Sequence, residues 1–200
     1  MDYFLSIDQG TTSTRCILFD QDGGIKKTHQ VEFKQIFPDN KSVEHDANEI
    51  LETVKTCIQY VTKDVEIESI KSIGITNQRE TTVAWSKSTG KPLYNAIVWQ
   101  DTRTQDICDE LLADESLSSL FEKTGLPVAT YFSLSKILWL IRNVPNIKKS
   151  LEDDVCFGTI DSWLIYNLTG NFYTDVTNAS RTLLYDLYDM EWCSDLLEKL

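Results

Sequence analysis

A short run of small polar residues near the amino terminus has the composition of a phosphate-binding turn. Residues 8–15 read DQGTTSTR, and the candidates within them are Asp8, Gly10, Thr11, Thr12, Ser13 and Arg15. Glycine adopts dihedrals closed to other residues and lets a ligand approach the main chain. The three hydroxyls and the main-chain N–H groups suit an anion, and Arg15 can neutralise phosphate charge. Asp8 can hold Mg²⁺ directly or through water, because magnesium prefers carboxylate and water oxygens.

This run lies between two apolar segments and not before a helix. The chain contains no GxxxxGK[ST] motif, so it is not a P-loop protein. Glycine, threonine and serine are also common turn residues, and an ordinary polar hairpin is therefore the alternative. The carboxylate that ends an apolar strand directly before the turn favours the phosphate interpretation.

Arg79 and Glu80 form a second candidate pair, directly after the apolar segment 70–75. A guanidinium group donates to two vicinal hydroxyls at once, and a carboxylate accepts from them, so the pair suits a polyol. A surface ion pair is the alternative, and the residues alone favour it because such pairs are common and contribute little. By the same reasoning, Trp99 and Tyr131 are interpreted as core aromatic residues.

Three short strands joined by tight turns are expected to begin the chain. They cover residues 3–7, 15–20 and 25–33 and would form an antiparallel meander. A helix then starts after Asp46, its expected N-cap, because apolar residues follow one face of a 3.6-residue period. These apolar residues are Ala47, Ile50, Leu51, Val54, Cys57, Ile58 and Val61.

Helices and strands alternate along the rest of the chain. A buried strand is expected at 70–75, and further strands at 81–85, 96–99, 156–159 and 182–186. Helices are expected at 102–113, from Ser133 to Pro145, at 162–168 and from Ser194. This order predicts an α/β domain with a mixed sheet, and the lack of helices between the first three strands excludes a Rossmann array.

Composition limits the partners and the compartment. The 200 residues carry a formal net charge of −12, whereas nucleic acid and anionic membrane both require basic surface. The longest apolar run, 137–141, is far shorter than the ~20 residues of a membrane span. No signal peptide is evident, and five widely spaced cysteines without a CxxC motif fit the reduced thiols of a cytoplasmic protein.

Four further blocks carry a resemblance to a known family. They are residues 75–82 (ITNQRETT), 94–101 (YNAIVWQD), 131–139 (YFSLSKILW) and 175–182 (DVTNASRT). With the hairpin, they are similar to the carbohydrate kinase family that contains the glycerol kinases, within the actin/hexokinase superfamily of ATPases. The blocks occur in the family's order along almost the whole chain.

The resemblance implies a ribonuclease H-like mixed sheet, as one lobe of a two-domain kinase. The implied reaction is ATP-dependent phosphorylation of glycerol to sn-glycerol 3-phosphate, with Mg²⁺, in a homo-oligomer (a dimer or tetramer). Arg79, Glu80 and Tyr131 would hydrogen-bond glycerol, and Trp99 would pack against its carbon skeleton. Lys136 and Arg181 lie in these blocks and Arg103 lies just after one, but for all three a structural role is at least as good an interpretation.

The resemblance also implies parts outside this sequence. Residues 1–200 would cover most of the N-terminal domain, and the second, ATP-binding domain would be absent. The general base, an Asp followed by Gln in the family, would lie beyond Leu200, so no catalytic residue is assigned within the chain. Two other hypotheses stay open: a related kinase for a different sugar or polyol, and a catalytically inactive lobe that binds a ligand alone.

Overall fold

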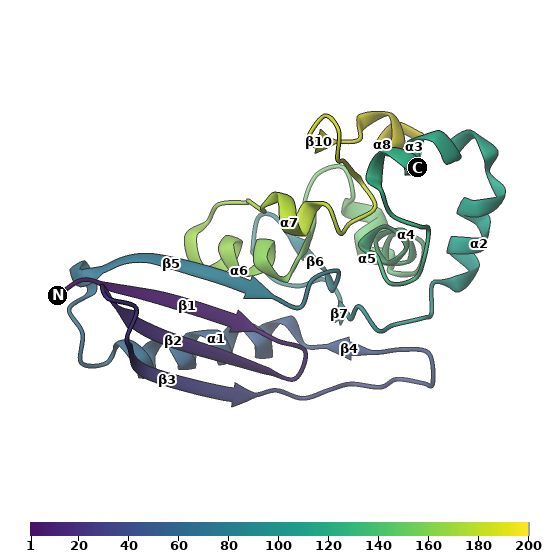
Figure 1. Cartoon of the computed structure of the whole chain (residues 1–200). Coiled ribbons are helices and arrows are strands. Elements are labelled where there is room, and N and C mark those ends of the chain that lie inside the picture. Colours follow the sequence, from purple (N-terminus) through teal and green to yellow (C-terminus); the bar gives the residue numbers. More distant parts are fainter. Residues whose placement is uncertain (200) are drawn as a thin grey trace. The chain divides into compact units, whose positions relative to one another are not determined.

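The computed structural model describes residues 1–199, apart from the side chain of Leu120. The chain divides into two compact units, traced in Figure 1. The first, here called the hairpin unit, comprises residues 1–35 and 45–78. The second, here called the helical unit, comprises residues 36–44 and the chain from Arg79 onward.

A four-stranded sheet forms the base of the hairpin unit. Its strands are β1 (Tyr3–Gln9), β2 (Ser13–Asp20), β3 (Ile25–Glu32) and β5 (Ile70–Asn77), in the order β3-β2-β1-β5. The first three form the expected antiparallel meander, and β5 runs parallel to β1. Alternate residues of β1 and β2 are buried, because successive side chains of a strand point to opposite faces.

Helix α1 (Ala47–Thr62) packs on β1, β2 and β3. It begins at the expected N-cap, where the Asp46 carboxylate accepts a hydrogen bond from the N–H of Asn48 (2.8 Å). Ile50, Val54 and Cys57 lie on its buried face and are fully inaccessible to solvent. Burial of each large aliphatic side chain contributes about 1.5–3 kcal/mol, so packing on the sheet holds this helix more than intrinsic propensity does.

Strand β5 differs from the expectation of a buried strand. The strand is present, but most of its side chains are exposed, and Ile73 is 56% exposed. Within residues 1–199, β5 is an edge strand of this sheet and pairs with β1 alone. The prediction of burial is wrong because an apolar segment does not reveal whether its strand has neighbours on both sides.

The helical unit contains a second four-stranded sheet, which the sequence did not indicate. Its strands are β4 (Glu44–His45), β7 (Ala96–Ile97), β6 (Thr82–Ser86) and β8 (Val155–Thr159), in the order β4-β7-β6-β8. The pairings of β6 with β7 and β8 are antiparallel, and every residue of β6 is buried. The expected mixed α/β sheet is therefore the sheet of the hairpin unit. The chain passes from one unit to the other within β4.

Most helices of the chain belong to the helical unit. They are α2 (Gln105–Ala113), α3 (Ser118–Thr124), α4 (Ser133–Asn143), α5 (Pro145–Ser150), α6 (Ile160–Thr169), α7 (Val176–Ala179) and α8 (Ser194–Lys199). The described residues also form two 3₁₀ turns, η1 (Ile67–Ser69) in the hairpin unit and η2 (Glu115–Leu117) in the helical unit. Helix α4 ends before Pro145 as expected, and α6 ends at Gly170 in the left-handed conformation (φ 77°). The short helices α3, α5 and α7 were not expected, because none spans enough residues to show a clear period.

Two expected elements begin three residues later than predicted. Helix α2 begins at Gln105 and not at 102, because the Asp101 carboxylate accepts from the N–H of Arg103 and holds a turn there (2.9 Å). The strand expected at 182–186 is reduced to β9 (Tyr185–Asp186), which pairs with β10 (Glu191–Trp192). Leu183 has a φ of 64°, which is incompatible with an extended strand.

Two apolar clusters that meet at α4 form the core of the helical unit. One joins α4 to α2, α3 and α8, and the other joins it to α5 and the sheet. All five cysteines are buried and free, as expected for reduced thiols. Among residues 1–199, no helix combines the length and apolarity that crossing a bilayer requires.

Candidate active site

The turn between β1 and β2 is closed by a hydrogen bond from the N–H of Gly10 to the carbonyl of Ser13 (2.9 Å). Thr12 is exposed at its tip. A Cβ atom added at Gly10 would stand 3.3 Å from the Ser13 carbonyl oxygen, which is a tight contact that a shift of a few tenths of an ångström would relieve. Gly10 does not have a positive φ. The expectation of a dihedral closed to other residues is therefore wrong, and what glycine provides here is the absence of a Cβ at a tight contact.

Asp8 and Arg15 face each other across the two strands. Nη2 of Arg15 lies 2.6 Å from Oδ2 of Asp8, and the two side chains are 46% and 36% exposed. An exposed pair of this kind is worth only about 0–1 kcal/mol, so either partner can turn to a ligand at little cost. Within residues 1–199 there is no group of three or more potential metal ligands. Asp8 could therefore hold Mg²⁺ only together with water or ligand oxygens, which is a set that magnesium accepts.

In the helical unit, Arg79 is exposed whereas Glu80 is only 3% exposed. Glu80 has a φ of 66°, which is uncommon for a residue other than glycine. Its carbonyl accepts hydrogen bonds from the hydroxyls of Thr82 (3.1 Å) and Ser133 (3.3 Å). Strained backbone of this kind persists only where the surroundings hold it, and it is frequent at functional sites.

Arg181 holds the Glu80 carboxylate. Its Nε donates to Oε1 of Glu80 at 2.6 Å. The same guanidinium lies 5.1 Å from the ring centre of Phe132 and 6.0 Å from that of Tyr131. Arg181 therefore connects the acidic candidate to the segment that carries the aromatic one.

Trp99 and Tyr131 form an edge-to-face pair, with ring centres 5.5 Å apart. Trp99 is half-buried and Tyr131 is 37% exposed, so neither is the fully buried core residue that its type suggested. The N–H of Trp99 donates to the hydroxyl of Thr81, which directly follows Glu80 (3.2 Å). A carboxylate and two partly exposed rings are thus linked within one unit, as a ligand with hydroxyls on a carbon skeleton requires.

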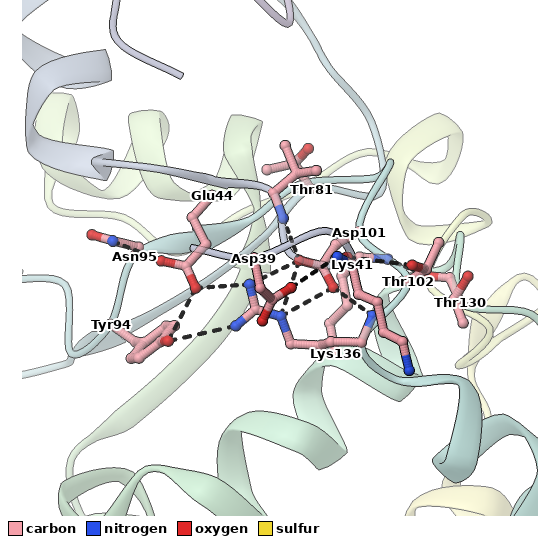
Figure 2. A network of polar contacts seen from close by, with 12 residues as sticks. Asp39, Lys41, Glu44, Thr81, Tyr94, Asn95, Asp101, Thr102, Thr130 and Lys136 are labelled. Carbon is pink, nitrogen blue, oxygen red and sulfur yellow. Dashed lines mark hydrogen bonds and ion pairs between the residues drawn. The ribbon is translucent and has the colours of Figure 1, made fainter. Parts of the chain in front are cut away.

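A buried charge network lies in the same unit, as Figure 2 shows. Nη2 of Arg103 lies 2.7 Å from Oε1 of Glu44 and 2.8 Å from Oδ2 of Asp101. Tyr94 and Asn95 donate further hydrogen bonds to Glu44 (3.0 and 2.8 Å). Burial alone would lower the pKa of Arg103, but its hydrogen bonds to the two carboxylates raise it above its usual range. Because residues 94–103 include Trp99, this network fixes the segment that presents the indole.

Lys136 has a fully buried side chain and no carboxylate partner within hydrogen-bond distance among the contacts of residues 1–199. Its ammonium donates to the carbonyls of Thr130 (2.5 Å), Tyr131 (2.8 Å) and Phe132 (3.2 Å), at the place seen in Figure 2. Burial lowers the pKa of Lys136 to about 7, although the negative charge of Asp101 opposes this. All three donors of the ammonium therefore hold the segment that carries Tyr131.

Sequence reasoning gave no role to Arg103, Lys136 or Arg181. A signal existed for Lys136, which lies four residues before the buried Leu140 on the apolar face of α4. A charge on such a face must be satisfied by hydrogen bonds. Arg103 and Arg181 lie in loops, where the sequence carries no comparable sign of burial.

Known proteins similar to this chain identify its family. A model of the "FGGY family of carbohydrate kinases, N-terminal domain" matches residues 3–200. A glycerol kinase of Staphylococcus haemolyticus is 50% identical over 203 residues, which cover 99% of this chain and 41% of that protein. A probable glycerol kinase of Caenorhabditis elegans is 48% identical, over 96% of this chain and 40% of that protein. The chain spans about two fifths of the length of these relatives.

Solved structures of carbohydrate kinases are also similar to this chain. Plasmodium falciparum glycerol kinase with ADP superposes with a TM-score of 0.91 at 42% identity, over 100% of this chain and 40% of that one. A ligand-bound xylulose kinase from Lactobacillus acidophilus has a TM-score of 0.87 at 24% identity over the same shares, which is a likeness of fold. Family model, relatives and fold lead to one conclusion, that this chain belongs to the FGGY family of carbohydrate kinases and corresponds to its N-terminal domain.

Proposed function

We propose that the protein carrying this chain transfers the terminal phosphoryl group of ATP to glycerol and forms sn-glycerol 3-phosphate. The observation that carries the proposal is the Glu80 carboxylate, held by Arg181 in the unit where Tyr131 and Trp99 form a partly exposed aromatic pair. The relatives named as glycerol kinases support the same acceptor, and the P. falciparum structure with ADP supports the nucleotide.

At the acceptor site, each group takes the part of glycerol that its chemistry fits. The exposed Arg79 guanidinium donates to two neighbouring hydroxyls, and the Glu80 carboxylate accepts from them. The Tyr131 hydroxyl supplies a further hydrogen bond. The Trp99 indole packs against the carbon skeleton. A site of this kind discriminates against analogues that lack a hydroxyl, because its polar groups would be left unpaired.

At the hairpin, the groups suit the phosphates of the nucleotide. Gly10, Thr11, Thr12 and Ser13 would surround them with N–H and hydroxyl donors, and Arg15 would neutralise charge. Asp8 would hold Mg²⁺ through water or phosphate oxygens, and the ion would neutralise charge on the transferred group. Phosphoryl transfer depends almost entirely on such positioning and electrostatic stabilisation.

The remaining machinery is proposed to lie outside residues 1–200. An Asp that acts as general base and an adenosine pocket on a second domain would complete the site, and closure of the two domains would exclude water. We therefore expect the isolated 200-residue chain to form little or no glycerol 3-phosphate. A cytoplasmic homo-oligomer, a dimer or tetramer, is the proposed form of the intact protein, in keeping with the net charge of −12.

The test uses the intact protein with Mg·ATP and a panel of acceptors that includes glycerol, xylulose and gluconate. Glycerol is expected to have the highest kcat/KM, and a clear preference for a sugar would refute the acceptor assignment. Arg79→Ala is expected to raise the KM for glycerol about tenfold or more, because a charge-assisted hydrogen bond is worth about 1.5–3 kcal/mol, and to leave the KM for ATP unchanged. Arg142→Ala, which removes an exposed arginine paired with Glu110, is the control and should change neither.

A further inference from the structure

Three glutamine amides and one imidazole gather against the turn of the hairpin. Gln9 ends β1, Gln35 follows β3, His45 precedes α1 and Gln78 follows β5, so they come from four separate parts of the hairpin unit. Gln9 and His45 are fully buried, Gln78 is 6% exposed, and Gln35 is half-buried. None of the four has a part in the proposed reaction. Buried polar side chains need a partner for each hydrogen-bonding group, which makes their contacts informative.

The amides donate to the carbonyl groups of the turn. The carbonyl of Gly10 accepts from Nε2 of Gln9 (2.8 Å) and from Nε2 of Gln78 (3.2 Å). The carbonyl of Thr11 accepts from Nε2 of Gln35 (3.1 Å). Two consecutive peptide groups of the turn are therefore fastened by side chains from outside the hairpin.

His45 decides which way two of these amides face. Its Nε2 lies 2.7 Å from the side-chain oxygen of Gln35, which can only accept, so Nε2 carries the proton. Its Nδ1 then has a lone pair, which accepts from Nε2 of Gln78 at 3.2 Å. Burial lowers the pKa of His45 to about 4, which agrees with a neutral ring of this single tautomer. Nε2 of Gln78 also lies 3.2 Å from the side-chain oxygen of Gln9, so His45 and Gln9 share the hold on this amide, whereas the oxygen of Gln35 is held by His45.

The orientation of the carbonyls fixes the orientation of the N–H groups. In a trans peptide the C=O and the following N–H point in opposite directions, and the described chain contains no cis peptide. With the carbonyls of Gly10 and Thr11 turned toward the amides, the N–H groups of Thr11 and Thr12 are directed away from them. Consecutive N–H groups that face one way are the arrangement by which a turn binds an anion.

We propose that His45 is a positioning residue for the phosphate turn: through Gln35 and Gln78 it holds the peptide groups of residues 10–12 with their N–H groups toward the nucleotide phosphates. This rests on the proposed function only in that the turn binds a nucleotide. It gives a role to His45, whereas the neighbouring Glu44 belongs to the network that positions Trp99. A histidine that served the fold alone would stabilise the unit without affecting one ligand more than another.

The experiment measures the affinity of the intact protein for Mg·ADP and for glycerol by calorimetry. His45→Phe keeps an aromatic ring against Phe33 (ring centres 5.0 Å apart) but removes both hydrogen bonds. Gln35→Met removes the amide that links His45 to the carbonyl of Thr11. Because Gln35 is only half-buried, this variant should still fold, and it tests the link if His45→Phe does not fold. Each is expected to weaken Mg·ADP about tenfold, the effect of one lost hydrogen-bond partner, and to leave glycerol affinity unchanged.

Two further variants and a control measure how the affinity for Mg·ADP depends on His45. His45→Gln supplies one donor and one acceptor and should bind Mg·ADP within about threefold of the wild type, which is within the usual spread of such effects. The double variant His45→Phe with Gln35→Met should be no weaker than His45→Phe alone, because Gln35 acts in series with His45. It can be weaker than Gln35→Met alone, since that single variant leaves the contact between His45 and Gln78 intact. His29→Phe is the matched control, since His29 stacks on Tyr60 (4.0 Å) and lies outside this network.

Wild-type affinity for Mg·ADP in Gln35→Met, or equal losses for ADP and glycerol, would overturn the proposal. A wild-type protein that binds Mg·ADP but phosphorylates no glycerol would refute the proposed function, and the same variant series would still test His45.

Discussion

Removing the guanidinium of Arg181 should weaken both the folded state and the binding of glycerol. In Arg181→Met, the aliphatic stem is kept but the 2.6 Å contact with Glu80 is lost. The Glu80 side chain is 3% exposed, so its carboxylate cannot turn to solvent to replace the lost partner. The perturbation therefore leaves a charge that is buried and uncompensated.

The size of the effect follows from this burial. Breaking a buried pair costs about 3–5 kcal/mol, and because Arg181 is itself 29% exposed we expect the lower end, about 3 kcal/mol. For a domain of this length, 1 kcal/mol shifts the Tm by roughly 2–4 °C, so the Tm should fall by about 6–12 °C. The KM for glycerol should also rise, because the carboxylate loses the 2.6 Å contact that holds it in place for the acceptor hydroxyls.

The assay compares Arg181→Met with Arg142→Met in the intact protein, by apparent Tm and by KM for glycerol and ATP. The Arg142–Glu110 pair has the same 2.6 Å separation, but its side chains are 48% and 59% exposed. Its loss should cost about 0–1 kcal/mol. In the double variant Arg181→Met with Glu80→Gln, no charge is left unpaired, so the Tm should recover while glycerol binding does not.

Equal small Tm shifts in the two single variants would refute the reasoning about burial. A large Tm loss with an unchanged KM for glycerol would show that the pair serves the fold and not the acceptor.

Other consequences can be tested separately. Thr12→Val and Ser13→Ala should lower kcat by about 10–100-fold with little change in the KM for glycerol, because their donors stabilise charge that develops on the transferred group; a change confined to KM would contradict this. Burial lowers the pKa of His45 from 6.5 in the unfolded chain to about 4 in the folded state, so the unfolded chain takes up the proton first as pH falls. The free energy of unfolding should therefore drop by up to about 3 kcal/mol between pH 6.5 and 4, relative to that of His45→Gln. Parallel curves of stability against pH for the two proteins would contradict this. Gly158→Ala should lower the free energy of unfolding by about 1–3 kcal/mol, because the added Cβ would lie 2.8 Å from Cβ of Ser162 and 2.9 Å from the indole of Trp85. Gly74→Ala is the control for the same thermal melts. Its added Cβ meets nothing within 4 Å, so its Tm should be nearly unchanged.

The sequence predicted most elements where a local rule governs them. The meander, the capped helix after Asp46 and the end of α4 before Pro145 follow from turn residues, capping and proline stereochemistry, which act within a few residues. The exposure of β5 and the separation into two sheets depend on which strands become neighbours, and periodicity carries no information on that. The strand expected at 182–186 is shortened because Leu183 has a positive φ, which the residue type does not indicate.

The candidate site also contains residues that the sequence indicated and residues that it did not. The hairpin stood out by composition, whereas the resemblance was needed to assign Arg79 and Glu80, together with Trp99 and Tyr131, to an acceptor site. The residues that hold them in place could not be found by spacing, since Arg181 lies 101 positions from Glu80 and the contact exists only in the folded chain. Residues that hold a site in place from a distant part of the chain are therefore found from the tertiary structure and not from sequence motifs.

The left-handed backbone at Glu80 also bears on how the protein responds to selection. A side chain in that region costs roughly 1–2 kcal/mol, which glycine would avoid. Because Arg181 is 29% exposed, water can reach part of its guanidinium once Glu80 is gone, so in Glu80→Gly the relaxed backbone offsets part of the loss of the ion pair. A library sorted for folding alone should therefore tolerate glycine or asparagine at this position, and the survivors would be folded proteins that no longer hold glycerol. Position 80 is thus a place where selection for activity is stricter than selection for stability.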